Sequence, residues 1–373
     1  MTDVAAREGL TFPALPAGLD TPRVVVDLAR VEANIGRLQG AMDARSIAVR
    51  PHAKTHKSLR IAGMQVAAGA RGITVGTLGE AEVFAAAGFD DLFLAYPIWA
   101  DGPKAARLRA LRDAVPRFAV GVESAGAAKR LGAAVAESAR PLEVLVEIDP
   151  GNRRTGVATP NGAVEVARAA QGAGLVIRGV FSHGGHAYHL DAAGSAGADE
   201  VRTLGAAADA LRSAGLEVSV VSAGSTPTMI TSSTGQVNEQ RAGTSVYGDR
   251  QQWVLGAMPP EGCAVAVAAT VVSVHDERLV LDAGAKALTK DRAEFLAGHG
   301  AIVSYPELVI ERVNDYHGIV AAPPDADRPR LGEVVAVIPN HVCPVIDLVD
   351  SVIVVAADGS LEEWPVDARG RNG

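Results

Sequence analysis

The stretch that decides the fold class is LEVLVEI at residues 142–148, which VIRGVFS at 176–182 and EVSVVS at 217–222 follow. Most positions in these runs are apolar, which is typical of strands that are covered on both faces. Ala-rich stretches with a helical period separate the runs, so this part of the chain alternates strand and helix. Such an alternation indicates an α/β fold with a parallel sheet.

The same alternation extends outward, from about residue 46 to residue 250. Five further strands are predicted at SIAVR 46–50, GITVG 72–76, DLFLA 91–95, RFAVGV 117–122 and AGTSVY 242–247. Amphipathic stretches between strands predict helices such as Leu59–Ala68, Glu80–Ala87 and Ala125–Glu137. Eight strand–helix units predict a (β/α)8 barrel of the TIM type. An open doubly wound sheet is the competing interpretation, and the barrel is favoured because no GxGxxG motif follows the first strand.

After residue 260 the helical period disappears and β-rich runs follow one another. These runs are CAVAVAATVVSVH at 263–275, RLVLDAG at 278–284, EVVAVIP at 333–339 and SVIVVAADG at 351–359. They predict a second, mostly antiparallel β domain, with which the early run RVVVD at 23–27 is expected to pair. We therefore assign residues 29–250 to the barrel and residues 1–28 plus 251–373 to the β domain.

Composition excludes several classes of protein. Of the 373 residues, 48% are apolar and 21% are charged, which is too apolar for a disordered chain. The formal net charge of −8, without a block of Lys or Arg, argues against a nucleic-acid partner. No apolar run approaches the ~20 residues that span a bilayer, so no membrane partner is expected. The only two cysteines, Cys263 and Cys343, fit a reducing compartment, and we expect a cytoplasmic globular protein.

A basic cluster, RPHAKTHK at residues 50–57, follows the first barrel strand. Because the carboxyl ends of barrel strands face the active site, a lysine here is suited to form a Schiff base. Strand alternation places Arg50, His52 and Lys54 on one face, and Lys57 is expected to begin the next helix. This favours Lys54 as the nucleophile. The alternative is a basic loop at the rim of the barrel.

Two loops of small residues come later, SAGSTPT at 222–228 after the seventh strand and EQRAGT at 239–244. Such loops leave backbone N–H groups and hydroxyls to bind phosphate, and phosphate sites of barrels lie after strands seven and eight. Taken alone, loops of this composition are usually only turns. Together with a lysine at a strand end, they indicate pyridoxal 5′-phosphate as the cofactor.

A third pattern, His341-Val342-Cys343, lies between two prolines in the β domain. On a strand this spacing puts His341 and Cys343 on one face, where imidazole and thiolate are able to share a Zn²⁺ ion. Two ligands are fewer than the four of a closed structural site, so positions would stay open for water or substrate. The alternative is a core histidine beside a small buried cysteine.

Two further loops are expected at the mouth of the barrel. HGGHAYH at 183–189 contains no HExxH pattern, and we interpret it as a lining loop in which Tyr188 contacts the cofactor or the substrate. EIDPGNRRTG at 147–156 follows the fifth strand, where an arginine is able to hold the phenolate oxygen of the cofactor. The alternative for that arginine is a surface ion pair.

These motifs together resemble the D-serine dehydratase and D-threonine aldolase family, which are metal-activated pyridoxal-phosphate enzymes of the alanine-racemase-like fold type. The resemblance extends from residue 20 to about residue 350 and rests on RPHAKTHKS, EIDPGNRRTGV, FSHGGHAYH, SAGSTPT, EQRAGTSVYGD, DAGAKAL and PNHVCP. It implies a (β/α)8 barrel plus a β domain, usually in a homodimer.

The resemblance also implies roles for individual residues. Lys54 would be the Schiff-base lysine and the catalytic base, Arg154 would hold the phenolic oxygen, and His341 with Cys343 would bind Zn²⁺. The implied phosphate cradle consists of Ser225, Thr226, Gly243 and Thr244. Arg241 is similar in position to the arginine that faces the pyridine nitrogen in alanine racemases.

The implied reaction is cleavage of a β-hydroxy D-amino acid. The His-x-Cys pair resembles the dehydratase branch, and a thiolate ligand suits Zn²⁺ whereas a carboxylate suits Mn²⁺ or Mg²⁺. We therefore predict a lyase like D-serine dehydratase, which releases a 2-keto acid and ammonia. A D-threonine aldolase, or an enzyme for D-threo-3-hydroxyaspartate, is the runner-up; a racemase or a pyridoxal-phosphate carrier would not need the metal pair. Ser245 and Tyr316 depart from the family pattern and bear on substrate identity.

Overall fold

The structure, a computed structural model, describes residues 10–373, which fall into two compact units. The barrel unit comprises residues 37–54, 59–243 and 371–373. The β unit comprises residues 10–36, 55–58 and 244–370 of the described chain. Helix α1 (Leu28–Asp43) contributes residues to both units.

Eight parallel strands form the barrel unit and pair in the order β2-β9-β8-β7-β6-β5-β4-β3. They are β2 (Ala48–Val49), β3 (Ile73–Val75), β4 (Asp91–Leu94), β5 (Arg117–Val122), β6 (Glu143–Ile148), β7 (Val176–Ser182), β8 (Val220–Ala223) and β9 (Glu239–Gln240). A bridge between His52 and Thr74 joins the segment after β2 to β3, so the order of paired strands returns to its start. The predicted (β/α)8 barrel is therefore confirmed.

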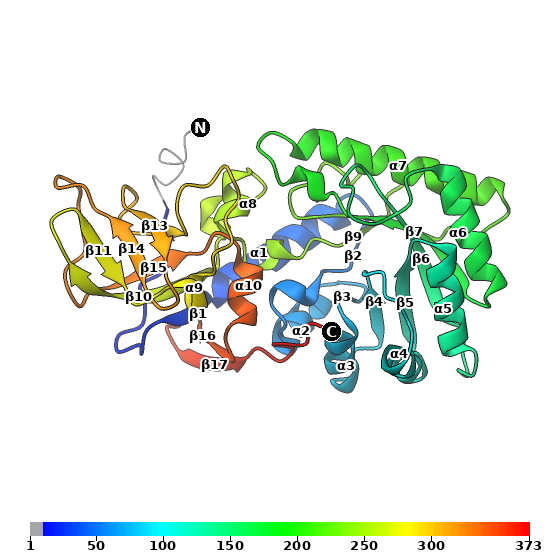
Figure 1. The fold of residues 1–373 in the computed structure, drawn as a ribbon, viewed down its shortest axis with the longest axis horizontal. Helices are drawn as coiled ribbons and strands as arrows, with labels where there is room; N and C mark the ends of the chain where they lie inside the picture. The colour runs from blue at the N-terminus through cyan, green and yellow to red at the C-terminus, as the bar shows by residue number, and fades with distance from the viewer. Residues whose placement is uncertain (1–9) are drawn as a thin grey trace. The chain divides into compact units, whose positions relative to one another are not determined.

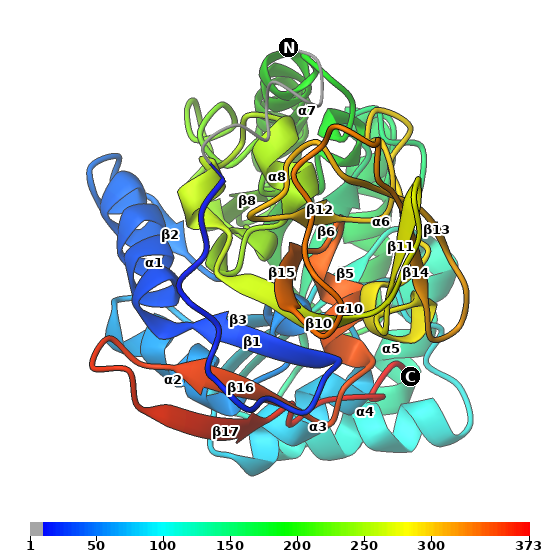
Figure 2. The same ribbon diagram turned by 90° about the vertical axis from the view of Figure 1, so that its left-hand side faces the viewer.

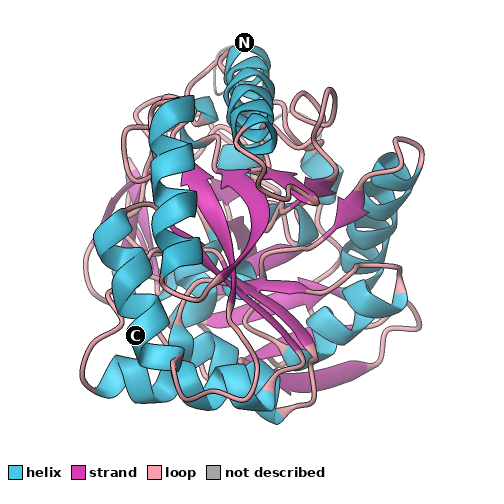
Figure 3. Cartoon of the chain, turned by 90° about the vertical axis from the view of Figure 1, so that its right-hand side faces the viewer, coloured by secondary structure: helices cyan, strands magenta, loops and turns pink. Residues whose placement is uncertain are grey.

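Six helices alternate with these strands and lie outside them (Figures 1 and 3). They are α2 (Leu59–Ala67), α3 (Leu78–Ala86), α4 (Pro103–Ala114), α5 (Ala125–Val135), α6 (Pro160–Gly172) and α7 (Ala193–Ser213). Thr77, Ser124 and Thr159 cap α3, α5 and α6 by accepting the N–H three residues further on, at 3.0, 3.2 and 3.1 Å. Each cap satisfies a backbone donor that the helix itself leaves unpaired, which fixes where the helix begins.

The eighth strand does not lie where the sequence predicts it. Residues 242–247 were expected to be a strand, but Thr244–Val246 form a 3-10 helix, η3, and the strand is β9, Glu239–Gln240. The prediction followed apolar residues, whereas β9 is polar and buried. Its side chains are satisfied inside the barrel: Glu239 accepts hydrogen bonds from Arg50 Nε at 2.9 Å and from Ser222 Oγ at 2.7 Å.

The β unit has a mostly antiparallel sheet with the main order β13-β14-β11-β10-β1-β16-β17. Its strands are β1 (Arg23–Asp27), β10 (Val265–Val274), β11 (Arg278–Leu281), β12 (Ala301–Ile302), β13 (Val309–Val313), β14 (Gly318–Ala321), β15 (Val334–Ile338), β16 (Ser351–Val355) and β17 (Leu361–Pro365). As predicted, β1 pairs within this sheet, antiparallel to β10 and parallel to β16; Figure 2 shows β1, β16 and β17 side by side.

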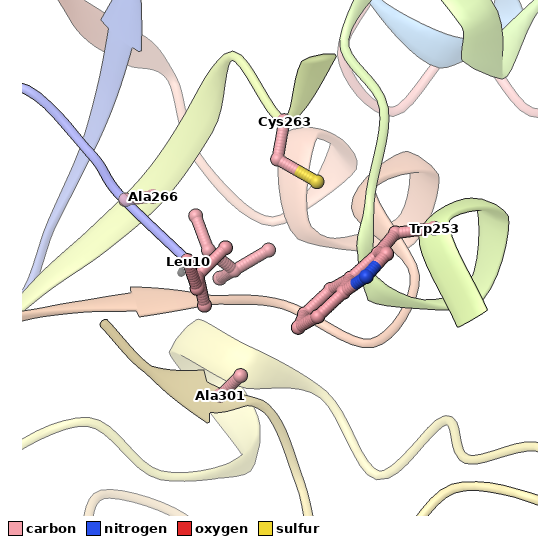
Figure 4. Packing of buried hydrophobic residues seen from close by; sticks show 6 residues of the cluster. Leu10, Trp253, Cys263, Ala266 and Ala301 are labelled. Atoms are coloured by element: carbon pink, nitrogen blue, oxygen red, sulfur yellow. The ribbon is translucent and has the colours of Figure 1, made fainter. Parts of the chain in front are cut away.

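Short helices complete the β unit, namely α8 (Arg250–Val254), α9 (Ala285–Leu288) and α10 (Val342–Asp347). Part of its core packs Leu10, Trp253 and Cys263 against the sheet residues Ala266, Ala301 and Ile338 (Figure 4). Cys263 is fully buried there, and burial raises the pKa of its thiol far above the usual value, so this cysteine is a packing residue. Among the described residues, no helix combines the length and the apolarity needed to cross a membrane.

Candidate active site

Lys54 lies just beyond β2, but not on a strand. It is the central residue of the 3-10 helix η1 (Ala53–Thr55), and its N–H donates to Nδ1 of His52 at 3.3 Å. The strand alternation that was expected to align Arg50, His52 and Lys54 is therefore wrong, because the chain leaves the extended conformation at Ala53. The Lys54 side chain is exposed, as a lysine that must meet a cofactor requires.

Lys57, the competing lysine, is held differently. It does not begin a helix, since its φ is +49° and α2 starts at Leu59. Within the β unit its Nζ lies 2.8 Å from Oδ1 of Asp347, and the side chain is buried. An ammonium in a buried ion pair is a poor nucleophile, because its nitrogen has no lone pair to attack an aldehyde and the carboxylate holds it in place. Local geometry thus favours Lys54.

Three of the predicted cations act electrostatically on His183, which directly follows β7 in the barrel unit. Burial lowers the pKa of His183 well below its usual value, and the charges of Lys54, Arg154 and Arg241 lower it further. The ring is therefore neutral, and its Nδ1 lies 3.2 Å from the carbonyl oxygen of Gly224. The C-terminal end of the barrel thus carries a positive field, which suits a phosphorylated cofactor and a carboxylate substrate.

The loop that carries Arg154 is held by two carboxylates that precede it in the sequence, Asp149 and Glu147. Asp149 Oδ1 accepts the N–H groups of Gly151 and Arg153, at 2.9 and 3.0 Å. Thr155 donates to Oε1 of Glu147 at 2.8 Å. These bonds hold the backbone on either side of Arg154, so its guanidinium is presented by a fixed loop.

Glu147 itself carries a buried oxygen, Oε2, that has no hydrogen-bond partner. Burial raises the pKa of Glu147, which favours its protonated form. A buried carboxyl oxygen without a hydrogen-bond partner, near Arg154 and Arg241, is expected where a polar ligand binds. The donor set at this end of the barrel therefore fits pyridoxal phosphate, because it offers an exposed amine for the aldehyde and cations for the phosphate and the phenolate.

The predicted phosphate loop follows β8 and is built around Ser225 and Thr226, both buried. Ser225 Oγ lies 3.0 Å from Oγ1 of Thr228, and Gly224 before it has a φ of +128°. Gly243 is the last residue of this stretch of the barrel unit, and Thr244 opens η3 in the β unit. Of the predicted cradle, Ser225, Thr226 and Gly243 therefore belong to the barrel unit and Thr244 to the β unit.

Glu200 was not found from the sequence, although it organises this loop. Its carboxylate, fully buried, accepts the N–H of Gly224 at 3.0 Å and the hydroxyls of Ser182 and Thr228 at 2.8 and 2.5 Å. It lies in α7, among alanines, 24 residues before Gly224. No local pattern marks such a residue, because its partners come from other elements.

Arg241 is buried in the barrel, and both terminal nitrogens of its guanidinium donate hydrogen bonds. It donates to Ser222 Oγ at 2.6 Å and to the carbonyl oxygens of Ala223 and Ser182. Its Cζ lies 5.3 Å from the ring centroid of Phe181, a cation–π contact. Burial lowers the pKa of Arg241, although an arginine stays charged at neutral pH. Arg241 therefore supplies a fixed positive charge beneath the mouth.

Three further predicted residues are Tyr188, Ser245 and Tyr316. The ring of Tyr188, which ends η2 (Gly185–Ala187), lies 6.4 Å from that of His183. In the β unit, Ser245 is buried within η3. Tyr316 is 62% exposed, and its hydroxyl accepts a hydrogen bond from Lys286 Nζ at 2.9 Å. Tyr188 thus accompanies the cationic cluster, whereas Tyr316 is free to meet solvent or a ligand.

His341 and Cys343 lie at the start of α10, not on a strand as the sequence suggested. His341 is the N-cap residue, and Cys343 is in the first turn. The strand β15 has already ended at Ile338, directly before Pro339. A helix start still leaves the two side chains close enough to interact. Burial lowers the pKa of His341, but the interactions with Cys343 and Asp291 outweigh it and raise this pKa to about 11.

The surroundings of this pair fit a divalent ion with open positions. The thiol of Cys343 lies 3.3 Å from the hydroxyl of Thr55 and 3.8 Å from that of Thr244, all within the β unit. Among residues 10–373, no three His, Cys, Asp or Glu side chains gather as a potential metal site. An imidazole and a thiolate without further protein ligands suit Zn²⁺ whose other positions bind water or substrate.

The segment 340–343 is fixed by residues that the sequence analysis did not single out. Asp249 Oδ2 accepts the N–H of Val342 at 3.0 Å, and the fully buried Arg250 donates to Oδ1 of Asn340 at 3.0 Å. Asn340 in turn donates to the carbonyl oxygen of Gly298 at 2.9 Å. The candidate metal ligands therefore stand on a rigid support.

Comparison with family models matches two consecutive parts of the chain. Residues 26–251 match the model described as "Alanine racemase, N-terminal domain". Residues 264–355 match the model described as "Putative serine dehydratase domain".

Individual relatives cover almost the whole chain. A D-threo-3-hydroxyaspartate dehydratase of Delftia sp. strain HT23 is 36% identical over 93% of this chain and 97% of its own. Its solved structure has a TM-score of 0.84, again covering 93% of this chain and 97% of its own. A D-threonine aldolase of an Arthrobacter species is 32% identical over 96% of each chain. A D-threonine aldolase structure from Filomicrobium marinum has 31% identity and a TM-score of 0.86, covering 94% of this chain and 96% of its own.

Proposed function

Because the chain belongs to the family that joins an alanine racemase N-terminal domain to a serine dehydratase domain, we propose that it is a pyridoxal-phosphate-dependent lyase of β-hydroxy D-amino acids. The named relatives, a D-threo-3-hydroxyaspartate dehydratase and D-threonine aldolases, act on this class of substrate. In the barrel unit the exposed Lys54 and the cations near His183 support the same assignment. A carrier of the cofactor would need no metal ligands in a second unit.

Between the two lyase reactions, we propose elimination, which gives a 2-keto acid and ammonia. The observation that carries this choice is the His-x-Cys pair, His341 and Cys343, at the start of α10, because this pair resembles the dehydratase branch. A cysteine ligand also favours Zn²⁺ over Mn²⁺ or Mg²⁺. A solved D-threo-3-hydroxyaspartate dehydratase, 35% identical to this chain, is a cysteine-to-alanine mutant described as being in the metal-free form, which supports a metal in that enzyme. Retro-aldol cleavage to glycine and an aldehyde is the second candidate, because two of the relatives are aldolases.

The roles of the residues follow from these placements. Lys54 Nζ would hold the cofactor at its aldehyde, and the same amine would take the Cα proton of the substrate from one face. Arg154 holds the phenolate oxygen and Arg241 supplies positive charge, while Ser225, Thr226, Gly243 and Thr244 bind the phosphate and Tyr188 lines the pocket. His341 and Cys343 hold the divalent ion. When bound, the cofactor supplies an electron sink and the ion supplies Lewis-acid activation of the β-hydroxyl.

The proposal also assigns each domain, the assembly, the location and the metal. We assign the cofactor chemistry to residues 29–250 and the metal site to the domain formed by residues 1–28 and 251–373, of which residues 1–9 lie outside the described chain. The family resemblance supports a homodimer, and the low cysteine content supports the cytoplasm. The metal is Zn²⁺, with Mn²⁺ as the alternative.

One experiment separates the reactions. The holoenzyme is incubated with D-serine, D-threonine and D-threo-3-hydroxyaspartate, with and without a chelator, and the products are identified. Keto acid and ammonia that disappear with the chelator support the proposed elimination. If the products are glycine and an aldehyde, the reaction is the aldolase cleavage and not elimination. If none of the three substrates is converted, both proposed reactions are overturned.

A further inference from the structure

A carboxylate that no part of the proposed mechanism uses lies against the candidate metal ligand His341. Asp291 Oδ2 is 2.5 Å from Nδ1 of the His341 ring, and both residues belong to the β unit. Asp291 stands 50 residues away in the sequence, outside every motif of the sequence analysis. The fold, and not closeness in the sequence, therefore brings Asp291 and His341 together.

The contact decides which nitrogen of His341 faces the ion. Nδ1 carries its proton toward Asp291, so Nε2 is the nitrogen that keeps a lone pair once the ring is neutral. The ring also interacts with the thiol of Cys343. Since Nδ1 is already occupied by Asp291, Nε2 is the atom left to share an ion with the sulfur.

The distance distinguishes a hydrogen bond between Asp291 and His341 from two atoms that would share one ion. Two atoms bound to one tetrahedral Zn²⁺ at about 2.0 Å each are about 3.3 Å apart. Asp291 Oδ2 and His341 Nδ1 are closer than that, which identifies a hydrogen bond between them.

The backbone holds Asp291 in register with His341. The carbonyl oxygen of Asp291 accepts a hydrogen bond from Nδ2 of Asn340 at 3.3 Å, and Asn340, the residue before His341, is buried. The N–H of Asp291 donates to Oγ1 of Thr289 at 3.2 Å. The carboxylate is thus tied to the ligand segment by its main chain as well as its side chain, which distinguishes it from an incidental surface ion pair.

We propose that Asp291 is a positioning residue of the metal site, which accepts the Nδ1 proton of His341 and orients Nε2 toward an ion shared with Cys343. The inference rests on the proposed function only in taking His341 and Cys343 as the ligands. Carboxylates that orient a ligating histidine change metal affinity by about 10- to 100-fold. The Asp291 side chain is 52% exposed, so we expect the lower end of that range, about tenfold.

The test measures metal binding, not turnover. Pyridoxal-phosphate-loaded enzyme, stripped of metal, is titrated with Co²⁺, whose thiolate charge-transfer absorption reports Cys343, and with Zn²⁺ against a chromogenic chelator. The variants are Asp291→Asn, Asp291→Ala and the matched control Asp358→Asn, whose carboxylate binds the N–H of Ser360 instead. We expect the Kd for Zn²⁺ to rise about tenfold in Asp291→Asn and further in Asp291→Ala, with the Co²⁺ band kept and the control unchanged.

The outcomes distinguish a failure of the proposed role of Asp291 from a failure of the proposed metal site at His341 and Cys343. A wild-type Co²⁺ band that Cys343→Ala abolishes, together with a Zn²⁺ Kd of Asp291→Ala within twofold of wild type, overturns the role of Asp291 alone. A wild-type enzyme without a Cys343-dependent band overturns the proposed metal site, and this inference with it. Circular dichroism of each variant shows that a loss of affinity is not a loss of fold.

Discussion

At the scale of single residues, Gly224 connects backbone conformation to cofactor binding. Its φ of +128° lies where other residues are strained, and an added Cβ would lie 2.6 Å from Gln240 Oε1 and 3.0 Å from Arg241 N. Gly224→Ala should therefore displace the loop of Ser225 and Thr226. We expect a loss of about 1–3 kcal/mol in stability and weaker binding of pyridoxal phosphate. Denaturant unfolding and a cofactor titration measure the two effects.

A matched control lies in helix α1. Gly36 is exposed within that helix, and an added Cβ would have nothing within 4 Å. Gly36→Ala should stabilise the protein by about 0.5–1 kcal/mol and leave cofactor affinity unchanged. If both variants behave alike, Gly224 is an ordinary turn glycine and the loop does not form the cradle.

At the scale of elements, strand β9 is held by charge. Arg50 contacts both Glu239, at 2.9 Å, and Asp91, at 2.5 Å, and all three side chains are largely buried. Glu239→Gln removes one carboxylate from a buried guanidinium, so we expect the protein to lose about 3 kcal/mol of stability at neutral pH. Urea unfolding at pH 7 measures it. A loss below 0.5 kcal/mol would show that Asp91 alone satisfies Arg50.

The same carboxylate predicts a pH dependence. Burial raises the pKa of Glu239, but the Arg50 charge outweighs it, and the net pKa is below the usual 4.5. A lowered pKa in the folded state gives stability that is present above pH 4.5 and is lost as the pH falls through the folded value. Stability curves of wild type and Glu239→Gln should therefore converge in acid. Parallel curves down to pH 3 would contradict this assignment.

Elements also show what the sequence could and could not predict. Strands β5 and β7 have the predicted bounds, because their apolar runs report burial on both faces directly. Strand β9 was missed because its burial depends on partners such as Arg50 and Ser222, which only the closed barrel brings near. Lys54 and His341 were singled out by residue type. The strand conformation predicted for them was wrong, because η1 and α10 begin where the sequence pattern predicts continued strands.

At the scale of the whole molecule, most candidate cofactor residues belong to the barrel unit, with Thr244 as the exception, whereas both candidate metal ligands belong to the β unit. Lys54, Arg154 and Arg241 lie in the barrel unit, whereas His341 and Cys343 lie in the β unit. Removing the metal with a chelator should therefore abolish turnover while the imine absorbance of the bound cofactor stays unchanged. Absorbance and product formation are recorded on the same sample. Loss of the imine together with the metal would show that the two sites depend on each other.

The most direct measurement of the central claim identifies the lysine that holds the cofactor. The enzyme is loaded with pyridoxal phosphate, reduced with borohydride, digested, and mapped by mass spectrometry. Our account predicts the pyridoxyl label on Lys54, with Lys57 unlabelled because its amine is buried against Asp347. A label on Lys57 or any other lysine, or no label at all, would contradict the account.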